Sequence, residues 1–282
     1  MRKFISRAAA LLLAGVMTAA VAGCGKNSDS KAKDTAKKWT ELDQTQITEA
    51  MGLGWNLGNQ LEASSGGLPS ETCWGNPEIT KELIDTIKAQ GFKTVRIPVS
   101  YLDMIGDGPD YKIDTDWLDR VQEVVDYVVD NDMFAIVNMH GDGYYTVDHS
   151  WLLCAEDDDK QTEIKDKYGK VWTQIADRFK DYDQHLIFES MNEEFNNDYG
   201  KPDANAYENI NAYNQIFVDS VRATGSNNEK RWLLLPGWNT NIEYTAGDEY
   251  NFKIPTDNGC KADGKRIMIS VDYYDPFNFT SN

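Results

Sequence analysis

The feature that most constrains the fold is a repeated alternation between short apolar runs and longer stretches with helical periodicity. Six apolar runs recur along the chain at intervals of about 40 residues. They are MGLGWNL (51–57), TVRIPV (94–99), FAIVNMH (134–140), HLIFESMNE (185–193), WLLLPGW (232–238) and RIMISVDYY (266–274). Strands that are apolar on both faces, separated by helices, predict a parallel sheet covered by helices.

The stretches between these runs predict helices. Asn76 and Pro77 are typical start residues, so we expect a first helix there that carries Ile79, Leu83 and Ile87 on one face. Further helices are expected to begin near Asp116, to run from about Ile164 to Phe179, and to end at Gly225.

Polar and aromatic residues follow the C-terminal ends of the runs. They are Asn56, Asn59, Arg96, Asn138, His140, Asn192, Glu193, Trp238, Asn239, Asp272 and Tyr274. The chain contains no glycine-rich phosphate-binding motif of the kind expected after the first strand of a doubly wound sheet. Active sites of (β/α)₈ TIM barrels lie at the C-terminal ends of the strands. We therefore predict an α/β fold of this class, with about six of its eight βα units in this chain.

The N-terminus resembles a lipoprotein-type signal peptide over residues 1–24. Basic residues precede an apolar run that ends in VAGC, so we expect cleavage before Cys24 and lipidation of its sulfur. A signal that is cleaved conventionally, or not at all, is the alternative. Residues 25–42 are polar and read as a flexible tether, and residues 43–282 read as one catalytic domain. The expected location is extracytoplasmic, on the cell surface or secreted, with membrane contact only through the lipid anchor.

Charge and cysteine usage exclude some classes of partner. The 28 basic and 46 acidic side chains give a net charge of −18, which argues against nucleic-acid binding. Cys24, Cys73, Cys154 and Cys260 lack the spacing of metal ligands, so no metal is expected. A disulfide between Cys73 and Cys154 and separate buried thiols both remain open. We expect a monomer.

Glu193 is the strongest candidate for acid–base chemistry. A glutamate at a strand end, surrounded by Phe188 and Met191, is expected to be desolvated and to have a raised pKa. Asn192 beside it can donate a hydrogen bond to a sugar 2-hydroxyl. Glu194 is expected to point the other way and to be a bystander. Two carboxyl groups that flank a bond are what glycosidic hydrolysis needs.

Five segments together resemble glycoside hydrolase family 5, nearest to its bacterial endo-β-1,4-glucanases (cellulases). They are GWNLGNQLEA (54–63), VRIPVSY (95–101), VNMHGDGY (137–144), LIFESMNEEF (186–195) and VDYYDPFNFT (271–280). The resemblance runs from about residue 43 to the C-terminus. It implies retaining hydrolysis of internal β-1,4-glucosidic bonds in cellulose or a related β-glucan polysaccharide, without a cofactor.

The resemblance also implies roles for individual residues. Glu193 would be the acid/base and Asn192 would hold the 2-hydroxyl, Arg96 would support the nucleophile, and Tyr274 would hydrogen-bond to it. His140 would bind sugar hydroxyls at the cleavage subsite. A structural ion pair for Arg96 and a core position for His140 are the alternatives. The expected substrate-binding residues are Asn56, Trp55, Asn138, Tyr144, Trp238 and Asp272.

The chain departs from the family pattern in two places. Asp272 stands where the family usually has a histidine, and we expect its charge to raise the pKa of neighbouring carboxyls and lower activity at neutral pH. The nucleophilic glutamate of the family lies at the end of a seventh strand and is absent from this chain, so it is expected beyond residue 282. Neither Glu243 nor Asp275 occupies that place. This chain alone is therefore expected to be weakly stable and inactive.

Two alternative functions remain open. One is a cell-surface protein that binds carbohydrate without catalysis. The other is an endo-β-mannanase or xyloglucanase of the same family, because the shapes of the loops determine which polymer is preferred.

Overall fold

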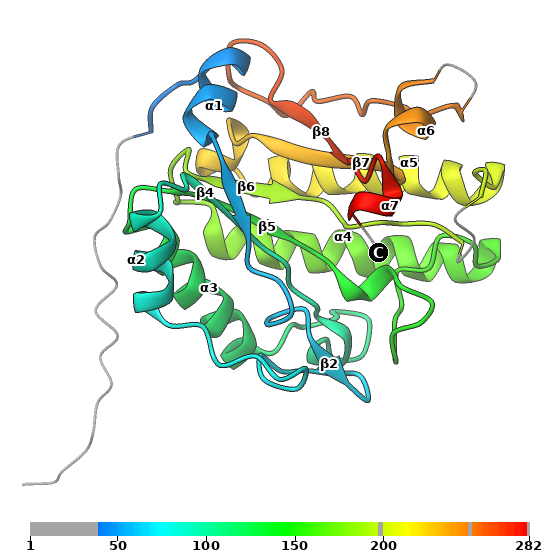
Figure 1. Cartoon of the computed structure of the whole chain (residues 1–282). Coiled ribbons are helices and arrows are strands. Elements are labelled where there is room, and N and C mark those ends of the chain that lie inside the picture. The colour runs from blue at the N-terminus through cyan, green and yellow to red at the C-terminus, as the bar shows by residue number, and fades with distance from the viewer. Residues whose placement is uncertain (1–38, 197–199, 248–249, 281–282) are drawn as a thin grey trace, which may run out of the picture. The chain divides into compact units, whose positions relative to one another are not determined.

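The computed structural model describes residues 39–196, 200–247 and 250–280, shown in Figure 1. The described residues all belong to one compact unit. The predicted signal peptide and its Cys24 lie outside the described residues. Within the described ranges, no helix is long and apolar enough to cross a membrane.

Six parallel strands form a half-barrel, which confirms the predicted fold class. Their order in the sheet is β1 (Gly54–Asn56), β4 (Thr94–Ile97), β5 (Phe134–Asn138), β6 (Leu186–Glu189), β7 (Leu233–Asn241) and β8 (Ile267–Asp272). Each strand lies within one of the six predicted apolar runs or overlaps it.

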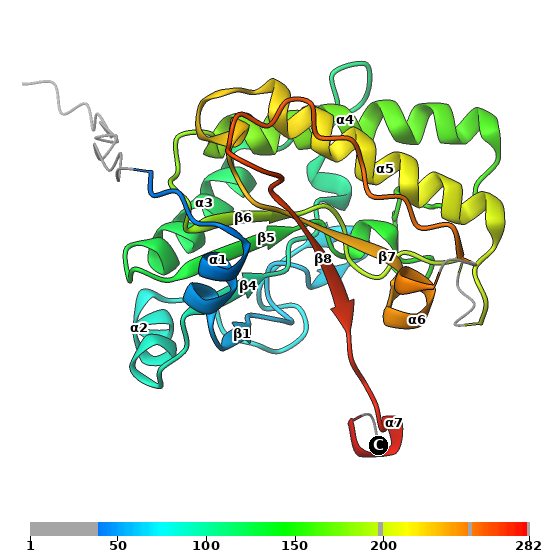
Figure 2. The ribbon, with the colours of Figure 1, turned by 90° about the horizontal axis from the view of Figure 1, so that it is seen from above.

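Helices α2 (Lys81–Ala89), α3 (Thr115–Val129), α4 (Asp158–Phe179) and α5 (Ala204–Ala223) follow β1, β4, β5 and β6. Each begins at a side chain that accepts a hydrogen bond from a backbone N–H of its first turn: Thr80, Asp114, Asp157 and Asp203. Helices α4 and α5 lie side by side in Figures 1 and 2. These helices cover one face of the sheet and leave the other face for the site.

The predicted start of α2 at Asn76 and Pro77 is wrong. The Asn76 side chain donates instead to the backbone oxygen of Asn59, at 2.9 Å. The helix begins four residues later, because the Thr80 hydroxyl accepts from the backbone N–H of Leu83 at 3.2 Å. A tertiary contact therefore takes the residue that local preference would have used as a cap.

Alternate residues of each strand face two different sides of the sheet. Ala135 and Val137 of β5 lie in the large core between the sheet and the outer helices. Phe134 and Ile136 face a smaller cluster on the inner side, which Ile47 of α1 (Gln44–Met51) closes. Because Asn138 pairs with Glu189 across the β5–β6 register, polar side chains follow these apolar ones on the inner side.

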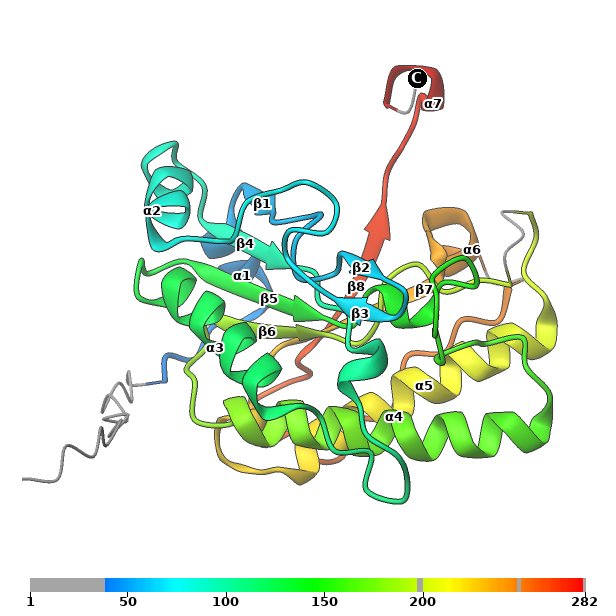
Figure 3. The same ribbon diagram turned by 90° about the horizontal axis from the view of Figure 1, so that it is seen from below.

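The remaining elements are short. They are a hairpin of β2 (Ser64–Ser65) and β3 (Leu68–Pro69), 3₁₀ turns at Leu102–Met104, Gly141–Gly143 and Ser226–Glu229, and the helices α6 (Ile242–Ala246) and α7 (Phe277–Thr280). Figures 2 and 3 show α7 beyond the end of β8, away from the sheet. Strands β1 and β8 form the two edges, where Leu53, Trp55, Val271 and Tyr273 are exposed.

Three cysteines of the described region are free thiols. Cys154 is buried, Cys260 is half-buried and Cys73 is exposed. Cys73 and Cys154 are therefore not paired, and Cys73 is not the buried thiol that was the other expectation.

Candidate active site

A cavity of about 670 Å³ opens on the inner side of the half-barrel, at the C-terminal ends of the strands. Eight of the predicted site residues line it together: Asn56, Arg96, His140, Tyr144, Asn192, Glu193, Asp272 and Tyr274. They come from β1, β4 and β8 and from the loops that follow β5, β6 and β8. The barrel topology thus brings together residues that are more than 200 positions apart in the chain.

Arg96 is the central cation of the cavity wall. Its Nε atom lies 2.6 Å from Oε2 of Glu189, a fully buried residue of β6. Its two Nη atoms donate to Asn56 Oδ1 at 3.1 Å and to Asn192 Oδ1 at 2.6 Å. Burial by itself lowers the pKa of this guanidinium, but the neighbouring Glu189 carboxylate outweighs that effect and leaves the pKa above its ordinary value.

This arrangement orients a chain of hydrogen bonds that ends at Glu193. Because Asn192 Oδ1 accepts from Arg96, its Nδ2 is the side that donates to the Tyr144 hydroxyl oxygen. Tyr144 must then use its own hydrogen elsewhere, and it donates to Glu193 Oε2 at 2.8 Å. Glu189, Arg96, Asn192, Tyr144 and Glu193 therefore form one ordered network.

Glu193 is held in an environment that favours its protonated form. Burial raises the pKa of its carboxyl, the hydrogen bond from Tyr144 opposes this, and the adjacent Asp272 carboxyl raises the pKa further. The expectations that Glu193 is desolvated and that Asp272 raises the pKa of a neighbour agree with these contacts. A carboxyl in this state can give a proton to a leaving group.

His140 lines the cavity as a neutral side chain. Burial lowers its pKa to about 3, and the nearby charge of Arg96 acts in the same direction. Asn138 Oδ1 accepts from the backbone N–H of Val99, so its Nδ2 faces His140 Nδ1 as a donor, at 3.4 Å. Nδ1 is then the acceptor and Nε2 carries the hydrogen. Asn138 is fully buried and does not line the cavity, so it orients His140 instead of contacting a ligand.

Two predicted sugar-binding tryptophans do not face the cavity. Trp238 is fully buried in the core, with its ring centroid 6.0 Å from that of Tyr207 of α5. The β7–β8 pairing is irregular between Pro236 and Asn241, and this shift turns Trp238 toward the helices. Trp55 is about half exposed on the other side of β1 from Asn56, where it packs edge-on against Phe92. The assignment of both residues to the cavity was wrong.

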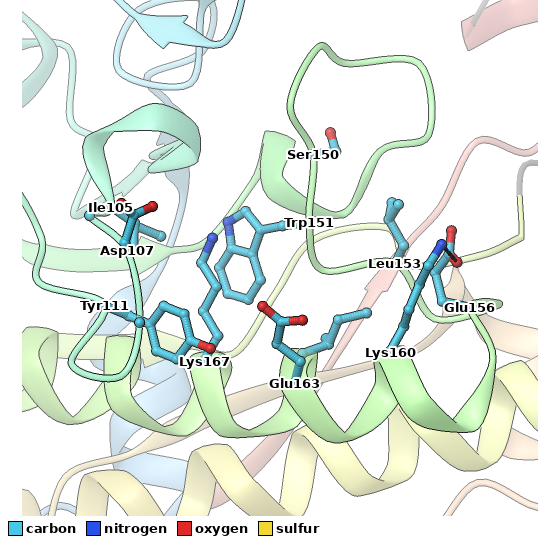
Figure 4. Close-up of a pocket in the computed structure, with 13 residues that line it drawn as sticks. Ile105, Asp107, Tyr111, Ser150, Trp151, Leu153, Glu156, Lys160, Glu163 and Lys167 are labelled. Atoms are coloured by element: carbon cyan, nitrogen blue, oxygen red, sulfur yellow. Dashed lines mark hydrogen bonds and ion pairs between the residues drawn. The ribbon is translucent and has the colours of Figure 1, made fainter.

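A second cavity, of about 380 Å³, lies between the loops after β4 and β5 and the start of α4. Figure 4 shows Tyr111, Trp151 and Lys167 together there, with the Lys167 ammonium 4.2 Å from the centroid of the Trp151 ring. Trp151 is held by Asp142, whose Oδ1 accepts from its indole N–H at 2.7 Å. It therefore faces this second cavity and not the one that holds Glu193.

Sequence reasoning missed Glu189, the anion that neutralises Arg96. It lies inside the apolar run LIFES, and a glutamate at an inward position of a buried strand is itself a signal, because such a charge requires a partner. Ser270 of β8 donates to its second oxygen at 3.1 Å. Glu62 was missed as well; it lines the cavity and accepts from the backbone N–H groups of Asn59 and Gln60.

The family model and two similar characterised proteins point to the same family. The model of the cellulase family (glycosyl hydrolase family 5) matches residues 59–282. Endoglucanase A of Paenibacillus barcinonensis is 52% identical over 275 residues, which cover 96% of this chain and 66% of that protein. Endoglucanase B of Clostridium cellulovorans is 36% identical, with 100% of this chain and 60% of that protein covered.

The fold of this chain is similar to those of solved family 5 structures. A family 5 xyloglucanase from Paenibacillus pabuli, in complex with ligand, has a TM-score of 0.81 and 56% identity, and the match covers 84% of this chain and 66% of that one. A broad specificity endoglucanase from Ruminococcus champanellensis with bound cellotriose has a TM-score of 0.77 and 38% identity, over 86% of this chain and 69% of that one. The chain thus spans 66% of the length of the Paenibacillus barcinonensis endoglucanase and 60% of the length of the Clostridium cellulovorans endoglucanase.

Proposed function

Because this chain belongs to glycosyl hydrolase family 5, we propose that the protein hydrolyses internal β-1,4-glucosidic bonds in cellulose or a related β-glucan, with Glu193 as the acid/base. Asn192 binds the sugar 2-hydroxyl, His140 donates from Nε2 to another hydroxyl, and Arg96 and Tyr274 act on the nucleophile. No cofactor takes part in this reaction, since two carboxyls and water suffice.

The observation that carries the proposal is the environment of Glu193. It is a partly buried carboxyl with a raised pKa, held by Tyr144 in a cavity that also presents Asn192, Arg96 and His140. A non-catalytic sugar-binding protein needs no such carboxyl, because a neutral amide in its place would hydrogen-bond to a hydroxyl equally well.

Two observations test the proposal directly. The product of the whole coding sequence, called the encoded protein below, should release reducing ends from carboxymethyl cellulose. It should also lower the viscosity of the cellulose solution early in the reaction, as internal cleavage requires. The coding sequence beyond codon 282 should contain a glutamate at the end of a further strand, about one βα unit of roughly 40 residues away. Sugar binding without any hydrolysis by the encoded protein would support the non-catalytic alternative.

Xyloglucan is a second candidate substrate. The 56% identity to a family 5 xyloglucanase supports it, and that identity exceeds the 38% to the cellotriose-bound endoglucanase. Initial rates on equal masses of xyloglucan, carboxymethyl cellulose and mannan distinguish the candidates. Faster release from xyloglucan would assign this specificity, and faster release from mannan would contradict the β-glucan assignment.

Replacing Asp272 by Asn is expected to move the alkaline limb of the kcat/KM profile to lower pH. The Asp272 carboxyl raises the pKa of Glu193, so its removal lowers that pKa. An acid catalyst must be protonated, and activity would therefore be lost at a lower pH than in the wild type. For Glu193 this is the reverse of the sequence-based expectation that Asp272 lowers activity at neutral pH, because a raised pKa keeps the acid protonated there. An unchanged alkaline limb would show that Asp272 does not act on Glu193.

The location of the protein at the cell surface, through a lipid on Cys24, is part of the same proposal. It is supported by the sequence VAGC after an apolar run. Cells given a labelled fatty acid should incorporate the label into the wild-type protein and not into Cys24→Ala. Equal labelling of the two would contradict the anchor.

A further inference from the structure

We propose that Glu194 is a positioning residue, whose buried carboxyl supports the Gly141–Tyr144 turn and through it sets the hydrogen bond from Tyr144 to Glu193. This inference rests on the proposed function of Glu193. It gives the second glutamate of the pair a role, where the sequence suggested a bystander.

The Glu194 side chain fills the space under Gly143. Glu194 is 1% exposed, and a Cβ atom built on Gly143 would lie 1.6 Å from its Oε1 atom and 2.3 Å from its Cδ atom. Gly143 is the last residue of the 3₁₀ turn Gly141–Gly143, and the residues on either side of this turn, His140 and Tyr144, both line the cavity. Position 143 therefore has no room for a side chain while the Glu194 carboxyl is in place.

Glu194 itself has little freedom to move. Its backbone oxygen accepts from the N–H of Asn239 at 2.8 Å, which ties it to the end of β7. Its backbone N–H donates to Asn192 O at 3.0 Å, so it is also tied to the residue that orients Tyr144. Because the backbone of Glu194 is anchored at these two points, its side chain can hold the turn above it in place.

The surroundings of the Glu194 carboxyl favour its uncharged form. Among the described residues its buried Oε2 atom has no hydrogen-bond partner. Burial raises the pKa of the carboxyl well above the usual range, and the nearby Asp142 acts in the same direction. Among the described residues, its charge raises the pKa of Tyr144, Tyr145, Cys154, Tyr168 and Tyr213. None of these described neighbours is a cation that could compensate an ionised Glu194.

Asp142, another buried carboxyl of the same region, has hydrogen-bond donors on both oxygens, although burial raises its pKa as well. Its two oxygens accept from the backbone N–H groups of Tyr101 and Leu102, each at 2.8 Å, and from the indole of Trp151 at 2.7 Å. We therefore assign the two adjacent glutamates different roles. Glu193 exchanges a proton in the cavity, while Glu194 keeps its proton and supports the turn from below.

Exchanging the sizes of the side chains at positions 143 and 194 tests the contact between Gly143 and Glu194, and it needs no activity measurement. Gly143→Ala alone should lower the midpoint of urea unfolding, and Glu194→Ala, which removes the clash, should recover part of that loss in the double variant. The matched control is Gly141→Ala, whose Cβ would meet Ser100 Oγ at 2.6 Å, and which Glu194→Ala should not rescue. Additive losses in the Gly143→Ala/Glu194→Ala pair would overturn the inference.

A double-mutant cycle on activity tests the route through Tyr144. In the encoded protein we expect Glu194→Ala and Tyr144→Phe each to lower kcat by about tenfold with KM within about threefold, and the double variant to be no more than about threefold worse than either. The isosteric Glu194→Gln should keep kcat within about threefold of the wild type. If the kcat losses of Glu194→Ala and Tyr144→Phe instead multiplied in the double variant, Glu194 would have only a structural role.

The charge state has its own readout. A carboxyl whose pKa is raised in the folded protein stabilises the fold only while protonated, so the wild type should lose stability relative to Glu194→Gln as pH rises above about 4.5. The unfolding midpoints of the two proteins should agree near pH 4 and diverge by pH 8. A constant difference would overturn the uncharged state. If the wild type hydrolyses nothing, the proposed function fails, and both unfolding experiments still decide the role of Glu194.

Discussion

Glu193→Gln is expected to lower kcat/KM on carboxymethyl cellulose by about 10²- to 10⁴-fold, the usual contribution of a general acid. The amide has the shape of the carboxyl and can still accept from Tyr144, but it has no proton to give to the leaving sugar. Circular dichroism and the affinity for cellotriose should change little. The loss should be smaller for an aryl cellobioside with an acidic phenol, because such a leaving group needs little protonation.

The matched control is Glu243→Gln. Glu243 lies exposed on α6 and does not line the cavity, so activity should stay within about twofold of the wild type. This control also tests the view that Glu243 is not the nucleophile. Equal losses for natural and activated substrates in Glu193→Gln would contradict an acid role, and a large loss in Glu243→Gln would contradict the location of the site.

Arg96→Met is expected to lower the free energy of unfolding by about 3–5 kcal/mol, because it leaves a charge buried without its partner. The partner, Glu189, is fully buried, and among the described residues Ser270 is its other side-chain hydrogen-bond donor. Asn192 would lose its orienting donor in the same variant, so activity should fall as well. Urea unfolding measures the first effect and initial rates measure the second.

Two further variants sharpen this prediction. Adding Glu189→Gln to Arg96→Met removes the unpaired charge and should recover part of the stability but not the activity. Lys81→Met breaks a pair with Asp85 in which both side chains are about half exposed, and it should lower the free energy of unfolding only slightly. A similar small cost for Arg96→Met would show that Glu189 is not left charged and unpaired.

The order of the strands and most of the site could be predicted from the sequence. The apolar runs marked six strands, and in a parallel barrel the residues that follow the strands meet at one end. That rule was enough to bring Arg96, His140 and Glu193 into a single cavity. It needs only the periodicity of side chains and the direction of the strands, both of which are local properties.

The tertiary structure decided the details that depend on contacts between distant segments. Asn76 does not begin α2, because it bonds to Asn59, and Trp238 leaves the cavity, because β7 is irregular beyond Pro236. The role of Glu189 follows only from its contact with Arg96.

The pair Glu193 and Glu194 shows the division most clearly. The sequence by itself determined that two carboxyls stand together after a buried strand, at the end of the sheet where the site was predicted. Which carboxyl faces the cavity and which fits beneath Gly143 was decided by the loops packed around them. Burial and hydrogen-bond partners set the charge of each carboxyl, and both are properties of the folded chain.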